Sequence, residues 1–470
     1  MNSLKSTPTA TWPLPRLPDR VHREGIKFLF TTLPSNDLGL LTRSLPIARE
    51  LKNRGHEIAF CSPAPAPSKI VAEAGFANLR PKDPFYALIS GDFSLTSFVR
   101  LMRAPRVGQK LGILAAFARQ MLHTTAEIWN IDHFMALLGA GNKEFVQINV
   151  EILVSLIQET QPDVVVDFWN PFACLASRVA RKPLITVIQA DMHPLSRGFI
   201  WWREPSPNLP TAVPAFNDAL AAFSLPPIQQ TGELLLGDKT LVLGIPETDP
   251  LPAGAEVTYI GPVLWQKQDE KLPAWVEHLP SGKPLIWVYP GNPRYAPGIS
   301  TAFDSGVVIS ACSEGLKDEP VQVAISTGHH AMPRKFLPLP ANFHHAPYLP
   351  GLAMAGRSDL LIHHGGYGSC QTGLYTGTPA LILPTYSERE SNARRVAAVG
   401  AGEFLVPEMD SFGRKKYVNP ETLRAKVWQL LSNPSYEENA MKIREKLRTY
   451  GGAATAAQLI ETFLEGRSID

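Results

Sequence analysis

The chain has 470 residues, 44% of them hydrophobic, and at roughly 100–200 residues per domain it is long enough for two to four domains with packed cores. Its 45 Lys and Arg residues against 43 Asp and Glu leave a net charge of +2 without a long basic run, which argues against nucleic acid as a partner. The 4 cysteines are scattered and none forms a CxxC pair, so they predict buried thiols in a reducing compartment.

The sequence shows no membrane-spanning or secretory segment. No apolar run reaches the ~18 residues that a spanning helix requires. The first 25 residues contain scattered prolines and no continuous apolar core, so residues 1–25 are predicted to be a disordered leader and not a signal peptide. We therefore expect a cytoplasmic protein.

The first half of the chain alternates strands and helices. Strand patterns end at proline or glycine, and helical patterns show apolar residues three and four positions apart. The expected strands are 26–33, 57–61, 163–168, 184–188, 240–243 and 258–262, and the expected helices are 41–52, 67–74 and 171–180. Between about 90 and 160 the pattern is helical only, which indicates a helical insert. Such alternation predicts a doubly wound parallel sheet.

A polar stretch with Pro and Gly, residues 266–282, is predicted to link an N-terminal domain (26–265) to a C-terminal domain (283–470), whose last helix could pack back on the first domain. The second half of the chain shows the same strand pattern, with short apolar runs at 285–289, 322–326, 360–362 and 380–383 that each end near Gly or Pro. Loops at the carboxyl ends of parallel strands line the ligand crevice, so the two domains should face each other across a cleft with a nucleotide-sized site.

The most informative segment is glycine-rich and runs from His364 to Leu374, after a strand and at the start of a helix. Glycines let the backbone approach a ligand closely, and the free N–H groups and dipole of a helix N-terminus favour an anion such as a pyrophosphate. His364 could donate a hydrogen bond to a phosphate oxygen, and Ser369 could add a hydroxyl.

The continuation of this segment to Gly402 resembles the donor-binding signature of family-1 nucleotide-sugar glycosyltransferases, HGGxGSxxxAxxxGxPxLxxPxxxDQxxNA. The resemblance extends to shorter stretches at 45–48, 55–57, 259–262, 326–328 and 348–350, and so covers nearly the whole chain except the helical insert. It implies the GT-B architecture: two Rossmann-like domains, with the donor held mainly by the C-terminal one and the acceptor by the N-terminal one.

By this resemblance, the donor site follows residue by residue. His364, Gly366, Gly368 and Ser369 would hold the diphosphate, while Glu388 and Arg389 would contact sugar hydroxyls and Asn392 would brace their loop; Gly291, Asn292 and Gly328 would line the nucleotide side. A carboxylate such as that of Glu388 can accept two hydrogen bonds from a vicinal diol. Fixed N–H dipoles and a histidine stabilise the leaving diphosphate, so no metal is expected. The adjacent histidine pairs do not suggest one, because neighbouring side chains on a strand point to opposite faces.

Two residues depart from the family pattern. The family usually places a catalytic histidine, or in some branches an aspartate, in the loop after the first strand, where this chain has Leu40. Asp37 is the only ionisable side chain in that loop and is the candidate base, its alternative role being that of a turn former or helix N-terminal acid. Arg389 stands where glutamine is usual, which leaves the donor sugar open: an acidic sugar is conceivable, or Arg389 pairs with Glu388 or Glu390, and a UDP-hexose is favoured.

Acceptor specificity is expected from the insert and from the loops that follow two strands of the first domain. The candidate acceptor-binding residues there are Phe168, Trp169, Asp191 and His193, with Trp201 and Trp202 adding aromatic surface; the alternative is that these aromatics belong to the core. Asp167, Asp191 and His193 are reserve candidates for the base.

These observations favour an inverting glycosyltransferase that moves a hexose from a nucleotide diphosphate sugar to a hydrophobic small molecule. The sugar nucleotide is a co-substrate, so no cofactor is expected, and we expect a monomer or weak homodimer. The alternatives are a catalytically silent auxiliary protein, since the usual histidine is missing, and a sugar-nucleotide epimerase. Transfer to nitrogen or carbon instead of oxygen would relax the need for a strong base.

Overall fold

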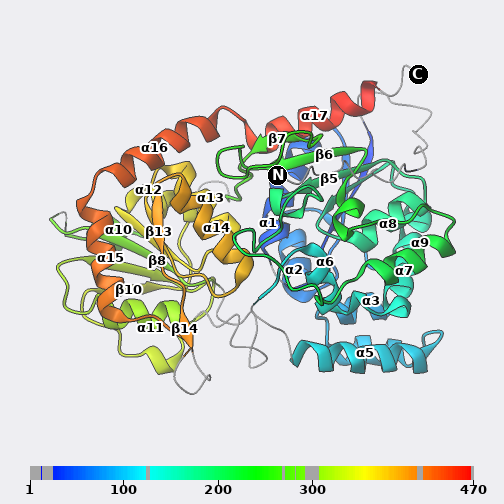
Figure 1. Ribbon diagram of the computed structural model, residues 1–470, viewed down its shortest axis with the longest axis horizontal. Coiled ribbons are helices and arrows are strands. Elements are labelled where there is room, and N and C mark those ends of the chain that lie inside the picture. The colour runs from blue at the N-terminus through cyan, green and yellow to red at the C-terminus, as the bar shows by residue number, and fades with distance from the viewer. Residues whose placement is uncertain are drawn as a thin grey trace.

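The computed structural model describes residues 12, 25–36, 38–122, 127–266, 270–280, 282–291, 306–409 and 416–466. Most of the expected leader, 1–25, lies outside these residues. The described chain forms two α/β domains side by side, with the N-terminal half in one and most of the C-terminal half in the other (Figure 1).

A seven-stranded parallel sheet forms the first domain, in the order β3-β2-β1-β4-β5-β6-β7. Every residue of β4 and β5 is buried, as expected for apolar strands of a parallel sheet that is covered on both faces. The strands are β1 (Lys27–Thr32), β2 (Glu57–Cys61), β3 (Ala77–Asn78), β4 (Val164–Phe168), β5 (Leu184–Ile188), β6 (Lys239–Leu243) and β7 (Thr258–Gly261).

Helices connect these strands, and no strand lies between β3 and β4 in the described part of the chain, where the helical insert is predicted. The longest of the insert helices, α7, begins at the N-cap Asn142, whose side chain accepts the N–H of Phe145, and it buries its apolar face against α8 and α9. The helices are α1 (Gly39–Asn53), α2 (Pro65–Glu73), α3 (Pro84–Ile89), α4 (Leu95–Leu101), α5 (Val107–Leu122), α6 (Ile131–Met135), η1 (Ala136–Ala140), α7 (Lys143–Thr160), α8 (Pro171–Val179), η2 (Ala190–Met192), α9 (Val213–Ala222) and η3 (Thr231–Leu235).

The second domain contains a six-stranded parallel sheet in the order β10-β9-β8-β11-β12-β13 and a small antiparallel pair, β14 with β15. Its strands are β8 (Leu285–Tyr289), β9 (Gln322–Ser326), β10 (Phe343–Ala346), β11 (Leu360–His363), β12 (Ala380–Ile382), β13 (Gly402–Phe404), β14 (Glu408–Met409) and β15 (Lys416–Tyr417). Its helices are α10 (Ala274–Glu277), α11 (Gly306–Gly315), η5 (Arg334–Phe336), α12 (Gly351–Arg357), α13 (Tyr367–Thr376), α14 (Ser387–Ala398), α15 (Pro420–Ser432) and α16 (Ser435–Arg448). The predicted pair of Rossmann-like domains is confirmed.

Two helices do not follow a simple division of the chain into two domains at the predicted linker. α10 falls inside the stretch predicted to be a linker but packs on the second domain, with Val276 buried and Trp275 stacked on His344 at 5.6 Å between ring centroids. The last helix, α17 (Gly452–Gly466), returns to the first domain, where Glu461 forms an ion pair with Arg54 (2.8 Å) and a hydrogen bond with His56 (3.0 Å). Figure 1 shows α16 and α17 crossing from one domain to the other.

The sequence analysis did not predict the short strands β3, β10 and β13. Each has at most four residues, and β10 carries two histidines, so none shows a recognisable apolar run. Within the described residues no helix is both long and apolar enough to cross a membrane.

Candidate active site between the two domains

The glycine-rich turn after β11 forms the N-terminus of α13. His363, the last residue of β11, is fully buried, and its Nδ1 accepts the backbone N–H of Gly365 at 3.1 Å. Gly365 has φ +89°, and a Cβ there would lie 2.8 Å from the carbonyl oxygen of Arg389, so both conformation and space require glycine. The N-cap is Gly366, which offers no side-chain cap. The first N–H groups of α13 therefore lack intrahelical acceptors and, with the helix dipole, form an anion-binding end.

His364 lies beside this helix end. Its Nδ1 donates to the carbonyl of Tyr289 at 3.3 Å, because a carbonyl can only accept. Its Nε2 faces Gly366, where an added Cβ would lie only 2.6 Å from that nitrogen. Burial lowers the pKa of His364 well below its ordinary value, and the positive charge of Arg389 lowers it further. The ring is thus neutral, with its Nε2 lone pair directed at the helix end.

The first turns of α14 carry the predicted sugar-binding residues. Glu388 is buried, which raises the pKa of its carboxyl group, and it accepts a hydrogen bond from Asn392 at 2.8 Å. The same amide nitrogen of Asn392 donates to the carbonyl of Gly365 at 3.0 Å. Asn392 therefore joins Glu388 to the glycine turn, so α14 and the start of α13 hold one another in place.

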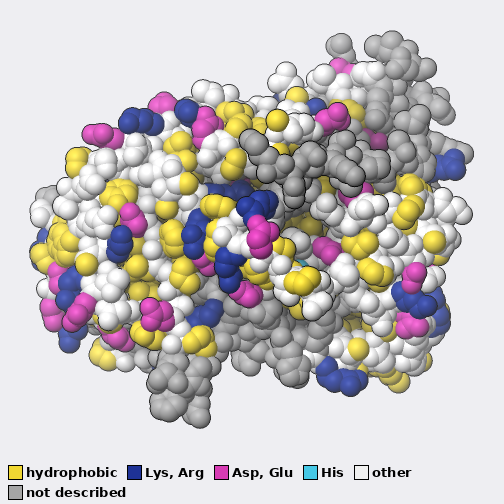
Figure 2. Space-filling model, viewed as in Figure 1, with side chains coloured by type: hydrophobic (Ala, Val, Ile, Leu, Met, Phe, Trp, Pro, Cys, Tyr) yellow, Lys and Arg dark blue, Asp and Glu magenta, His cyan; other side chains and the backbone are white. Residues whose placement is uncertain are grey.

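Arg389 forms no ion pair with a carboxylate among the described residues. Its Nη1 donates to Thr385 at 2.7 Å, and its guanidinium lies over the ring of Tyr386 at 4.7 Å. Glu390, one of its expected partners, pairs with Arg394 at 2.7 Å instead. The positive charge of Arg389 is therefore available to a ligand. It acts on His363 and His364 and lowers the pKa of both rings. Figure 2 shows Lys and Arg side chains gathered over α14.

The other predicted donor residues border the same turn. Gly368 lies in the first turn of α13, and an added Cβ would meet nothing within 4 Å, so this side of the helix is open. Ser369 follows it, with its N–H bonded to the carbonyl of Gly366. Gly291 has φ +86° and lies against the ring of His364. Gly328 follows β9 with φ +61°. Asn292 lies outside the described residues.

The first turns of α14 also contact the first domain. Ser387 exchanges hydrogen bonds with the backbone of Ile128, with distances of 2.8 and 2.6 Å. Ser391 donates to Asp191 at 3.2 Å and accepts from the indole of Trp201 at 3.1 Å. Asp191 follows β5, so these contacts bring the carboxyl-end loops of the first sheet against the α14 turns that carry Glu388 and Arg389.

Two of the predicted acceptor-binding aromatics behave differently. Phe168 is completely buried in β4, 6.4 Å from the ring of Phe30, and is therefore a core residue and not part of an acceptor surface. Trp169 follows it with φ +65°, and its indole nitrogen is buried without a hydrogen-bond partner among the described residues. Trp169 is also a core residue, buried against Phe199 at 6.4 Å between ring centroids, and it differs from Phe168 in carrying an N–H without a described partner.

Asp191 does not serve as an exposed acceptor contact. It forms an ion pair with Arg395 of α14, and burial raises its pKa to about 6 although the arginine opposes that shift. Asp249, in the loop after β6, shares the same guanidinium at 3.3 Å. Asp167, a reserve candidate for the base, is also enclosed: it accepts hydrogen bonds from Thr31 and from the N–H of Asn170, and burial raises its pKa to about 7.

His193 remains a polar group of the first-domain loops. Its Nδ1 accepts the N–H of Leu195 at 3.2 Å, and burial lowers the pKa of the ring to about 4. The neutral ring must then carry its proton on Nε2. In this arrangement Nε2 of His193 is a hydrogen-bond donor, and its reserve role as the base stays a prediction.

Sequence reasoning missed several residues of this region. Gln189, directly after β5, is buried, and neither its amide oxygen nor its amide nitrogen has a partner among the described residues. In the second domain His329 stacks on Tyr348 with 4.2 Å between centroids and 11° between planes, which presents a flat aromatic surface after β9. Arg395 was also missed. Only the short motif at 348–350 could have indicated Tyr348, whereas a single glutamine or arginine gives no pattern.

Asp37 lies outside the described residues, and Leu40, at the position of the family's usual histidine, is buried in the first turn of α1.

The second domain and its site match known enzymes. Residues 317–460 match the model of the erythromycin biosynthesis protein CIII-like C-terminal domain. A PGL/p-HBAD biosynthesis glycosyltransferase of Mycobacterium tuberculosis is 29% identical over an alignment of 318 positions that covers 62% of this chain and 68% of that protein. The solved structure of the spinosyn forosaminyltransferase SpnP has a TM-score of 0.63 at 19% identity and covers 94% of this chain and 100% of its own. The glycosyltransferase VinC, solved in complex with dTDP, has a TM-score of 0.62 at 17% identity over 93% and 99%.

Two facing Rossmann-like domains with an anion-binding turn in the second define the GT-B class of glycosyltransferases. The matching domain, the related glycosyltransferases and the structural neighbours all indicate a GT-B glycosyltransferase of the family-1 type, as the resemblance in the sequence predicted.

Proposed function

We propose that this protein transfers a hexose, with inversion of the anomeric centre, from a nucleoside diphosphate sugar to a hydrophobic small molecule. The observation that carries the proposal is the junction of Gly365, Asn392 and Glu388, which joins an anion-binding helix end to a buried carboxylate suited to sugar hydroxyls. The structural neighbour VinC, bound to dTDP, supports a diphosphate in such a fold. We favour UDP as the nucleotide.

The diphosphate would lie at the N-terminus of α13. Its oxygens would accept the free N–H groups near Gly368 and a hydrogen bond from Nε2 of His364. Since Nδ1 of His364 already donates to Tyr289, Nε2 can donate only when the ring is an imidazolium. The negative charge of the diphosphate stabilises that form, so we expect donor binding to take up a proton.

The acceptor would bind at the carboxyl ends of β4 and β5. There Trp169 and Gln189 contribute buried polar atoms without described partners, and His193 offers its Nε2–H. An unsatisfied buried polar group costs about 1–3 kcal/mol, which a ligand hydroxyl or carbonyl would recover. Surrounding apolar side chains suit a hydrophobic molecule with few polar groups.

Transfer requires an acceptor atom to lose its proton while the bond from the anomeric carbon to the β-phosphate oxygen breaks. The acceptor attacks from the face opposite the diphosphate, which inverts the centre. We retain Asp37 as the base, because Asp167 and Asp191 are enclosed by hydrogen-bond donors and Nδ1 of His193 already accepts the N–H of Leu195. The departing charge is stabilised by the helix end and by His364.

The test is to incubate the purified enzyme with UDP- and dTDP-hexoses and a library of phenolic, polyketide and nucleoside acceptors, and to follow products by mass spectrometry. A hexose adduct that is lost in His364→Ala and at least 100-fold slower in Asp37→Asn would support the proposal. The exposed His278→Ala is the matched control for the histidine variant. Sugar-nucleotide binding without turnover against any acceptor would instead favour an auxiliary role, and absence of binding would refute the donor site.

A further inference from the structure

A second surface lies far from the candidate active site, on the helical insert. Its apolar side chains are strongly exposed: Phe93 is 67%, Leu95 80% and Met102 61% accessible. Leu95, Phe98 and Met102 are three and four positions apart, so they share one side of α4, opposite the buried Ser97 and Leu101. An exposed apolar stripe of this kind marks an interaction surface.

The next helix, α5, also has exposed apolar side chains. Its inner side packs on the domain through Ile113 and through Phe117, which stacks on Phe145 at 5.8 Å. Its outer side is also largely apolar, with Leu111, Ala115 and Ala118 exposed. A helix on the outside of a domain ordinarily carries charged residues on its outer face. α5 lies along the outer margin of the first domain, away from α14 (Figure 1).

The charges of this segment have one sign. Between Asp92 and Glu127 the sequence contains Arg100, Arg103, Arg106, Lys110 and Arg119 and no Asp or Glu. The basic and apolar side chains along this edge are visible over α5 in Figure 2.

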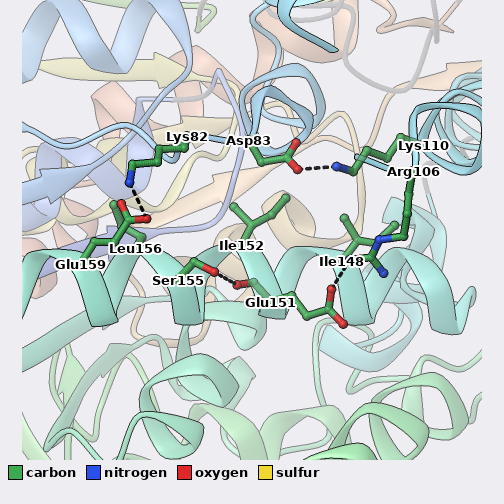
Figure 3. Close-up of a pocket in the computed structure, with 10 residues that line it drawn as sticks. All are labelled: Lys82, Asp83, Arg106, Lys110, Ile148, Glu151, Ile152, Ser155, Leu156 and Glu159. Atoms are coloured by element: carbon green, nitrogen blue, oxygen red, sulfur yellow. Dashed lines mark hydrogen bonds and ion pairs between the residues drawn. The ribbon is translucent and has the colours of Figure 1, made fainter. Parts of the chain in front are cut away.

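Three acidic residues near this segment are already paired. A hollow of about 250 Å³ between α7, the start of α5 and the residues before α3 is bordered by three ion pairs (Figure 3). They are Arg106 with Glu151 (2.5 Å), Lys110 with Asp83, and Lys82 with Glu159 (2.9 Å). The charges of Arg106 and Lys110 are therefore balanced by Glu151 of α7 and by Asp83.

Three arginines of the segment remain without an acidic partner among the described residues. Arg100 donates to the carbonyl of Lys82 and Arg119 to that of Ala115, and Arg103 is exposed. Asp92, the nearest acid in sequence, is buried and bonded to Ser97, with Arg80 at 3.7 Å. The outward charge around the apolar side chains is thus positive.

We propose that this membrane-docking surface, made of Phe93, Leu95, Phe98, Val99, Met102, Leu111, Arg100, Arg103 and Arg119, binds the surface of an anionic lipid bilayer. Apolar side chains inserted at the boundary of headgroups and acyl chains, together with arginines beside anionic headgroups, are the two contributions that hold amphipathic helices on membranes. Its charge fits lipid phosphates better than another copy of this chain, whose matching surface would be equally positive. The proposal goes beyond the transfer reaction and depends on neither its donor nor its acceptor.

The test is sedimentation of the full-length protein with phosphatidylcholine vesicles that contain or lack phosphatidylglycerol. We expect binding to the anionic vesicles, which weakens as salt is raised. Phe93→Ser combined with Leu95→Ser, and separately Arg103→Gln combined with Arg119→Gln, should each abolish or strongly reduce it. At about fivefold per arginine, the charge variant should lower the partition coefficient by roughly 25-fold.

The matched control is Leu337→Ser, which removes an apolar side chain of the second domain that is 53% exposed and should leave binding unchanged. All the substituted side chains are exposed, so circular dichroism and the Tm should match the wild type. Absence of sedimentation with anionic vesicles would overturn the proposal, as would equal binding by the variants. Concentration-dependent dimerisation that disappears in the variants, without vesicle binding, would assign the surface to a second copy and also overturn it.

Discussion

Arg395 of the second domain forms an ion pair with Asp191 of the first, and the same guanidinium reaches Asp249 at 3.3 Å. Asp191 and Asp249 are almost completely buried. Burial raises the pKa of both carboxyl groups, and the arginine opposes that shift, so the cation stabilises their ionised form. The two buried carboxylates at the contact between α14 and the first domain therefore share one positive charge.

Removal of that charge should destabilise the protein strongly. Arg395→Met leaves two carboxylates buried without their cation, and breaking a buried pair in this way costs about 3–5 kcal/mol. We expect the Tm to fall by several degrees, with a larger fall at pH 8 than at pH 5, because both carboxyl groups can be protonated at the lower pH. Arg197→Ala, which breaks the exposed pair with Glu204, is the control and should change the Tm little. An unchanged Tm for Arg395→Met would contradict this role.

A substitution of Gly368 should have opposite effects on the stability of the protein and on its affinity for the nucleotide. An added Cβ meets no atom within 4 Å, and alanine is favoured over glycine in a helix, so Gly368→Ala should raise stability by about 0.5–1 kcal/mol. The methyl group would nevertheless occupy the side of the helix end where a diphosphate would lie. We therefore expect UDP affinity, measured by calorimetry, to fall about tenfold or more.

Gly112→Ala is the matched control for that experiment. Gly112 lies in α5 and an added Cβ there also meets nothing within 4 Å, so it should give the same gain in stability. Its UDP affinity should equal that of the wild type. If Gly368→Ala binds UDP normally, the diphosphate does not lie on this side of α13.

Donor binding should depend on pH through His364. In the free protein its pKa lies well below the ordinary value, whereas a bound diphosphate raises it. The bound form then holds more protons than the free form, so affinity should fall as pH rises, by up to tenfold per pH unit. Calorimetry from pH 5.5 to 8.5 in buffers of different ionisation enthalpy would measure this uptake.

The terminal phosphate of UDP also titrates, with a pKa of about 6, and so contributes to the pH dependence of binding. His364→Gln removes the contribution of the imidazole and leaves that of the phosphate. Proton uptake should be smaller in this variant over the whole range. Identical pH profiles for the variant and the wild type would show that His364 does not become charged on binding.

Arg389 should influence the choice of sugar. It has no carboxylate partner in the described part of the chain, so a donor with an acidic sugar could pair with it, whereas a glutamine would bind neutral hydroxyls. We expect Arg389→Gln to lower kcat/KM at least tenfold for a UDP-uronic acid and to change it less than about threefold for a neutral UDP-hexose. Arg394→Gln, which loses the pair with Glu390, is the control for removal of a charge from α14. Equal losses for the two donors would show that Arg389 does not read the sugar.

Most of the regular structure could be predicted from the sequence because its determinants are local. β4, β5 and β8 are short runs of mostly apolar residues, and Gly365 carries the left-handed conformation that the turn after β11 requires. The donor motif was found for the same reason, since Gly365, Glu388 and Asn392 lie within one short stretch of chain. Edge strands of two to four residues carry too few side chains to form a pattern.

What the tertiary structure alone decided concerns residues far apart in the sequence. Asp191 lies 204 positions from Arg395, so no spacing could show that this carboxylate binds a cation instead of an acceptor. Phe168 and Trp169 are adjacent aromatic residues, and only the tertiary structure shows that both are buried in the core and that the indole N–H of Trp169 has no partner among the described residues. The sequence alone was sufficient to predict the two domains and the glycine-rich turn with its anion-binding helix end. The packing of one domain on the other decides which polar side chains pair across the interface and which remain free to bind a ligand. Burial and pairing depend on all the neighbours of a side chain in space, and these cannot be read from the order of residues along the chain.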